Sequence, residues 1–112
     1  LDQKKRNEER ALARKRAEEL LIRELDDVQR LSLKECGFFF VNAPSGVRYR
    51  IRKGREGNVD KMHSQEDRPH SKLCIHPRAY VPDYDTMLAQ KLMIEHDERE
   101  FLRIANETII RN

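Results

Sequence analysis

The pattern of hydrophobic and polar positions first indicates a long helix. Residues 2–35 contain no Gly or Pro and are rich in Ala, Leu, Glu, Lys and Arg, which favour helix. Apolar side chains recur there at steps of three and four, as one thin stripe formed by Ala13, Ala17, Leu21, Leu25, Val28 and Leu31 or Ser32. A helix of this length would be roughly 50 Å long at 1.5 Å per residue, longer than a small domain covers. The sequence therefore predicts that its polar first half is an arm, exposed to solvent or laid on a partner.

Beyond Gly37 the pattern changes to strands and turns. Gly is a frequent helix stop, and residues 38–41, Phe-Phe-Phe-Val, have strand character. Residues 47–52 alternate between apolar and arginine side chains, the period-two signal of a half-buried strand with one basic face. Two further strands are predicted, at 58–62 and 73–76. The stretch between them, residues 63–72, has no strongly apolar residue and is predicted to be a mobile loop.

After Pro82 the period becomes helical again. Met87, Leu88 and Leu92 predict a buried face for a helix over residues 83–95, and Asp97 followed by Glu100 resembles the capping box of a shorter second helix. Ile109 and Ile110 lie beyond the expected helix stop at Asn106, where they either dock on a neighbouring subunit or fray.

These elements predict an α+β fold with two regions. Residues 1–36 form a charged amphipathic helical arm, and residues 37–112 form a small antiparallel β-sheet of about four strands with two C-terminal helices. Hydrophobic and charged residues each make up 38% of the chain, so the core is small. We therefore expect stabilisation by a partner surface.

The net charge of +3 conceals segments of opposite sign. Residues 3–16 carry +5, residues 17–44 carry −3, residues 45–78 carry +5 and residues 79–112 carry −3. A pI near 9.0 therefore reflects two basic regions instead of a uniformly basic surface.

The first candidate binding feature is the arginine strand. Alternate side chains on one face of a strand stand about 6.8 Å apart, so Arg48, Arg50 and Arg52 would form a row, continued by Lys53 and Arg55. Such a row is typical of a solvent-exposed sheet face, and it is also able to bind phosphates or an acidic protein surface. Tyr49 points to the opposite face, so the strand itself supplies no aromatic ring for base stacking.

The second candidate is the basic start of the helix, with Lys4, Lys5 and Arg6 as phosphate contacts. Glu8 and Glu9 interrupt this run, and many of its charges can pair at three- or four-residue spacing. A solvated arm or a helix laid on another protein or on a second copy is therefore favoured over a nucleic-acid grip. The candidate protein-interface residues are Ala17, Leu21, Leu25, Val28, Ile109 and Ile110.

Metal binding and catalysis have little support in the sequence. Cys74 and His76 are weak candidate metal ligands, because structural zinc sites usually show paired spacings such as CxxC, which this chain lacks. No Gly-rich phosphate loop, nucleophile elbow or HExxH motif occurs either, so no cofactor and no enzymatic activity is expected. Spacing leaves open whether Cys36 and Cys74 form a disulfide.

The sequence thus favours a non-enzymatic structural subunit of a larger complex or viral particle. It would dock through its N-terminal helix, as a homo-oligomer or with other proteins. The alternative is a nucleic-acid-binding or regulatory module that uses the arginine face and the basic arm on phosphates. Without a recognisable secretion signal or membrane span, an intracellular or particle-associated location is expected.

Overall fold

The computed structural model describes residues 2–54, 56–64, 66–75 and 81–110. Its elements along the chain are α1 (Asp2–Glu24), α2 (Asp27–Cys36), β1 (Phe38–Asn42), β2 (Arg48–Arg52), β3 (Val59–Met62), β4 (Pro69–Cys74), α3 (Asp83–His96), α4 (Glu98–Ile104) and β5 (Asn106–Ile109). The predicted α+β class, with a long N-terminal helix and two C-terminal helices, is confirmed.

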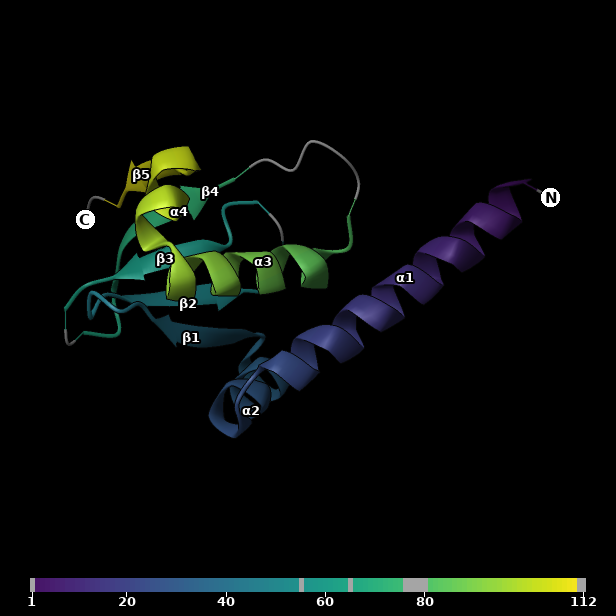
Figure 1. The fold of residues 1–112 in the computed structure, drawn as a ribbon, viewed down its shortest axis with the longest axis horizontal. Helices are drawn as coiled ribbons and strands as arrows, with labels where there is room; N and C mark the ends of the chain where they lie inside the picture. The colour runs from purple at the N-terminus through teal and green to yellow at the C-terminus, as the bar shows by residue number, and fades with distance from the viewer. Residues whose placement is uncertain (1, 55, 65, 76–80, 111–112) are drawn as a thin grey trace.

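The strands form one antiparallel sheet in the order β1-β2-β3-β4-β5. The first four follow one another along the chain, and β5 returns after the two C-terminal helices to pair with β4 (Figure 1). The core lies between one face of this sheet and the helices. It comprises Phe39, Val41, Tyr49, Ile51, Val59 and Leu73 from the strands and Leu21, Leu25, Met87, Ile94 and Phe101 from the helices.

The expectation of one continuous helix over residues 2–35 is wrong. Asp26 has extended backbone angles, φ −78° and ψ 174°, and caps the new helix α2. Its carboxylate accepts a hydrogen bond from the Gln29 N–H at 2.7 Å, while the Gln29 side chain accepts one from the Asp26 N–H at 3.1 Å. This capping box satisfies backbone donors that a helix start leaves unpaired, so the chain turns here at little cost.

The turn places α2 along the outer edge of β1 (Figure 1). Gln29 Nε2 donates to the Phe40 carbonyl at 2.8 Å, and Ser32 Oγ donates to the Phe38 carbonyl at 2.6 Å. An edge strand otherwise presents unpaired carbonyls to other chains, so α2 protects this edge of the sheet.

The arm is shorter than the sequence predicted, and part of its apolar stripe belongs to the core. Ala17, Leu21 and Leu25 are 3%, 0% and 2% exposed, because the C-terminal half of α1 packs against α3. These three candidate interface residues are therefore buried within their own chain. Residues 2–16 are all exposed, and this part of α1 projects from the body (Figure 1). We call residues 2–16 the arm.

Two expectations for the C-terminal half of the sheet are also wrong. The predicted loop over 63–72 is part of β4 from Pro69 onward, and β5 was not predicted. Of the two alternatives for Ile109, fraying is wrong, because Ile109 pairs with Ser71 in the β4–β5 ladder, and docking on a neighbouring subunit stays a prediction. The Ile110 N–H donates to the His70 carbonyl at 3.0 Å. Ile109 remains 57% exposed.

Candidate functional site on the open face of the sheet

The sheet has one face that α3 and α4 do not cover. Strand pairing sets Phe38 opposite Arg52, Phe40 opposite Arg50 and Asn42 opposite Arg48. Arg50 is also opposite Asp60, and Asp60 is opposite Lys72. Because side chains alternate along a strand, these residues lie on the side opposite buried Phe39, Tyr49 and Ile51. We call this side the open face; it comprises Phe38, Phe40, Asn42, Arg48, Arg50, Arg52, Asp60 and Lys72.

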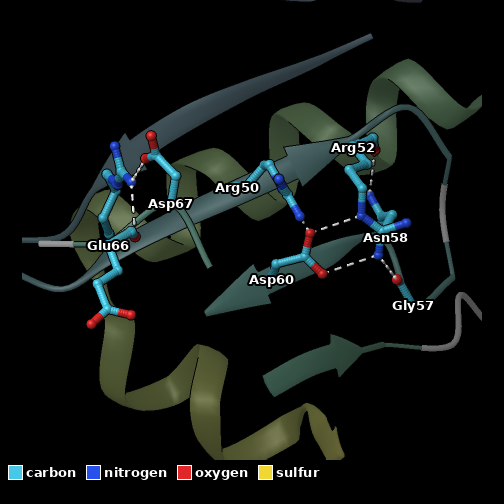
Figure 2. A network of polar contacts seen from close by, with 8 residues as sticks. Arg50, Arg52, Gly57, Asn58, Asp60, Glu66 and Asp67 are labelled. Carbon is cyan, nitrogen blue, oxygen red and sulfur yellow. Dashed lines mark hydrogen bonds and ion pairs between the residues drawn. The ribbon is translucent and has the colours of Figure 1, made fainter. Parts of the chain in front are cut away.

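A buried carboxylate organises the arginines of the open face. Asp60 has a side-chain exposure of only 1%, and its Oδ2 accepts hydrogen bonds from Arg50 Nε at 2.9 Å and Arg52 Nε at 2.8 Å. Arg52 Nη2 also reaches Asp60 Oδ1 at 3.1 Å and the Gly57 carbonyl (Figure 2). Both guanidinium groups are therefore fixed in position, and the single negative charge of Asp60 neutralises one of their two positive charges.

The third arginine of the row is held more loosely. Arg48 Nη2 pairs with the carboxylate of Asp67 and donates to the Glu66 carbonyl at 3.3 Å. The Asp67 side chain is 84% exposed, so this ion pair is screened by water and contributes little to stability. Asp67 can therefore be displaced by a stronger anionic ligand.

Two aromatic rings lie on the same face as the arginines, which the sequence alone did not indicate. The Arg48 Cζ atom is 4.2 Å from the centroid of the Phe40 ring, and the Arg50 Cζ atom is 5.3 Å from that of Phe38. The two rings meet edge to face with centroids 5.6 Å apart. Cation–π contacts of this kind place a guanidinium over the face of an aromatic ring. The open face thus combines charge with flat, half-buried aromatic surface.

The open face continues into a hollow at the Arg48 end of β2. This cavity of about 620 Å³ is bordered by Arg48, Asn42, Lys61 and His63, with the turn residues Ser45 and Gly46. The His63 and His70 rings lie edge to face with centroids 5.2 Å apart. Polar and apolar side chains line this hollow, with basic Arg48 and Lys61 and acidic Asp67 among them, and its size is within the range of small-ligand sites.

Other predicted contact residues lie elsewhere. Lys53 turns towards α3, where its Nζ is 5.4 Å from the centroid of the Tyr84 ring, and hydrogen bonding to Tyr84 raises the pKa of Lys53. Arg55 lies outside the described residues. Lys4, Lys5 and Arg6 are exposed on the arm. Four residues of the open face were not predicted as contact residues from the sequence: Phe38, Phe40, Asp60 and Lys72.

The candidate metal ligands do not gather into a site among the residues that the structure describes. Across the described ranges, no three His, Cys, Asp or Glu side chains come together as a metal site would require. Cys36 is exposed and Cys74 is half-buried, and no disulfide joins them. His76, the other weak metal candidate, lies outside the described residues. In the part of the chain that the structure describes, no helix combines the length and apolar character needed to cross a bilayer.

Two polar groups on the helical side of the sheet serve the fold. Tyr49 is fully buried and its hydroxyl donates to Glu98 Oε2; burial foremost, and then this hydrogen bond, raise the pKa of Tyr49. Asn58 and Gln90, 2% and 3% exposed, exchange reciprocal amide hydrogen bonds of 2.9 and 3.0 Å. This pair ties the start of β3 to α3.

The fold and the open face define an α+β chain with an antiparallel sheet, one side of which α3 and α4 do not cover. Comparison with known proteins adds no relative: no family model, no curated protein and no solved structure matches the chain.

Proposed function

We propose that this protein is a non-enzymatic assembly subunit that joins a larger complex by docking its helical arm on a neighbouring protein. The single observation that carries the proposal is the exposure of every residue from 2 to 16 in a helix that projects from the body (Figure 1). An isolated helix of about this length is only marginally stable in water, because nucleation is costly and most helical stability in proteins comes from packing. A partner surface would supply that packing.

Charge supports a second copy of this chain as the neighbour. The arm carries seven basic and three acidic residues, a net charge of +4. Residues 83–110, which contain α3, α4 and β5, carry seven acidic and three basic residues, a net charge of −4. Opposite potentials steer association and fix the orientation of partners.

Exposed apolar side chains occur both on the arm and on the acidic C-terminal region of residues 83–110. Leu12 on α1 is 47% exposed, and Leu92, Ile104 and Ile109 on the C-terminal elements are 40%, 39% and 57% exposed. Such residues supply the water-excluding part of an interface, while the charges form its rim. Because the arm and the acidic surface are different parts of the chain, their contact would be head-to-tail and would build rings or filaments.

Sedimentation velocity over a wide concentration range tests the proposal. The full chain is expected to associate with increasing concentration, and a chain lacking residues 2–16 is expected to remain monomeric. Lys4→Glu combined with Lys5→Glu should weaken association strongly, whereas the matched control Arg23→Glu with Lys34→Glu, which changes the net charge equally outside the arm, should not.

A mixing experiment identifies the docking surface. Asp83→Lys combined with Glu107→Lys is expected to abolish self-association in the same way as the arm variant, and a mixture of the two variants should pair, because each retains one intact surface. A full chain that stays monomeric at all concentrations would refute docking on a second copy.

A further inference from the structure

The geometry points to the open face as a binding site for single-stranded nucleic acid. This inference concerns a different surface from the arm and does not depend on self-assembly. It rests on three observations: a row of cationic side chains, outer Arg50 donors that the pairing with Asp60 leaves open, and aromatic rings beside the arginines.

The first observation is the row of positive charge. Arg48, Arg50 and Arg52 lie on alternate positions of one strand, and Lys72 lies two strands away across Asp60. The open face as defined contains these four cations and one acidic residue, Asp60. Its net charge is therefore +3 before the exposed Asp67 is counted. A row of cations along one face matches the repeating phosphates of an extended strand.

The second observation explains why the arginines can bind a ligand although two of them are paired. Asp60 receives the Nε atom of Arg50, and among the residues that the structure describes the terminal nitrogens of Arg50 meet no protein acceptor. The Arg50 side chain is 22% exposed and that of Arg48 33%. Asp60 therefore acts as a positioning residue that holds Arg50 by its inner edge and leaves its outer donors for a phosphate.

The third observation is the aromatic surface. Arg48 lies over the Phe40 ring, and Arg50 lies over the neighbouring Phe38 ring. Proteins that bind single strands use aromatic rings and arginine planes to stack unpaired bases. In a duplex the bases are already stacked on each other, so these flat surfaces favour a single strand. The hollow beside Arg48, bordered by His63 and Lys61, has room for a further nucleotide unit.

An acidic protein segment is the competing ligand for this charge. It would use Arg48, Arg50 and Lys72 equally well, but it would gain nothing from Phe38 and Phe40 stacking against planar bases. The placement of both rings beside the guanidinium groups therefore favours nucleic acid.

Fluorescence anisotropy with labelled single-stranded oligonucleotides tests the inference. The probes are a DNA and an RNA oligonucleotide of equal length, a duplex of the same sequence, and a polyglutamate peptide. Single strands are expected to bind at least several-fold more tightly than the duplex or the peptide. A difference between DNA and RNA would show whether a 2′-hydroxyl is read. Tighter binding of polyglutamate, or of the duplex, would overturn the proposal.

Two variants separate stacking from charge. Phe40→Leu keeps the position apolar and is expected to weaken single-strand binding roughly tenfold while leaving its salt dependence unchanged, because the ring carries no charge. Arg48→Gln with Lys72→Gln should weaken binding and make the slope of log affinity against log salt shallower by about 1.4, because each phosphate that a cation neutralises on a single strand adds about 0.7 to that slope. Neither variant leaves a buried charge without a partner, because Asp67, the partner of Arg48, is exposed and Lys72 is on the surface.

The controls distinguish this inference from the proposed assembly. Arg23→Gln with Lys34→Gln removes the same charge elsewhere and should alter binding little. A chain lacking residues 2–16 should still bind single strands, even though it no longer self-associates. If Phe40→Leu, shown by circular dichroism to be folded, bound as tightly as the unchanged protein, the stacking role would be refuted. If deleting the arm abolished binding while the two open-face variants did not, the site would be wrong.

Discussion

The ion pairs of Asp60 give the most quantitative test of the structure. Replacing both partners, Arg50→Gln with Arg52→Gln, leaves a carboxylate that is 1% exposed without a cation. Breaking a buried pair in this way typically costs about 3–5 kcal/mol, because the remaining charge is neither hydrated nor neutralised. Asp60→Asn should cost less, about 1–2 kcal/mol, since the two arginine side chains are 22% and 35% exposed and can turn towards water.

The decisive comparison is the variant that combines all three substitutions. It removes the stranded charge, so it is expected to be more stable than the double arginine variant by at least about 1 kcal/mol, despite carrying one more substitution. Urea denaturation followed by circular dichroism measures this. With a slope of about 1–3 kcal/mol per molar urea, a loss of about 4 kcal/mol should lower the midpoint of the double variant by roughly 2 M. A combined variant less stable than the double variant would show that the Asp60 carboxylate does not depend on the two arginines for its neutralisation.

Three further predictions concern the fold. Asn58→Leu should destabilise the protein by about 2–3 kcal/mol, because it leaves the buried amide of Gln90 unpaired, and replacing both residues by apolar side chains should recover part of that loss in urea denaturation. Tyr49→Phe should make the stability of the protein less sensitive to alkaline pH. Because the pKa of Tyr49 is raised in the folded state, its hydroxyl stays neutral there, whereas in the unfolded chain it ionises above about pH 10, so stability present below that pH is lost above it. Thermal melts of the variant should therefore show a smaller fall in melting temperature above about pH 10 than melts of the unchanged protein. Asp26→Ala should cost about 1 kcal/mol through loss of the cap of α2, whereas an unchanged melting temperature would contradict the cap assignment.

The elements that the sequence predicted well are those with strong local periodicity. The arginine alternation over residues 47–52 and the helical spacing of Met87 and Leu88 depend only on neighbouring positions, and the structure has β2 and α3 there. The break at Asp26 was missed because apolar residues continue at helical steps through Leu25 to Val28. The signal was present, however, in the spacing of Asp26 and Gln29, which suits a capping box.

The candidate site could not be predicted because it depends on strand register. Residues 38–41 are apolar at every position, so their pattern does not show which rings face the core and which face solvent. Only the pairing of β1 with β2 places Phe40 opposite Arg50, and only the pairing of β2 with β3 places Asp60 between two arginines. Likewise β5 is a four-residue strand with one strongly apolar side chain, and its partner β4 lies more than thirty positions earlier.

Amide hydrogen exchange of residues 2–16 tests the proposed docking of the arm most directly. At low concentration these amides should exchange rapidly, since a marginally stable exposed helix opens readily. With rising concentration their exchange should slow in parallel with the association seen by sedimentation, while the amides of β2 change little. Association that proceeds while the arm continues to exchange at its dilute rate would contradict the proposal that the arm is what holds the subunits together.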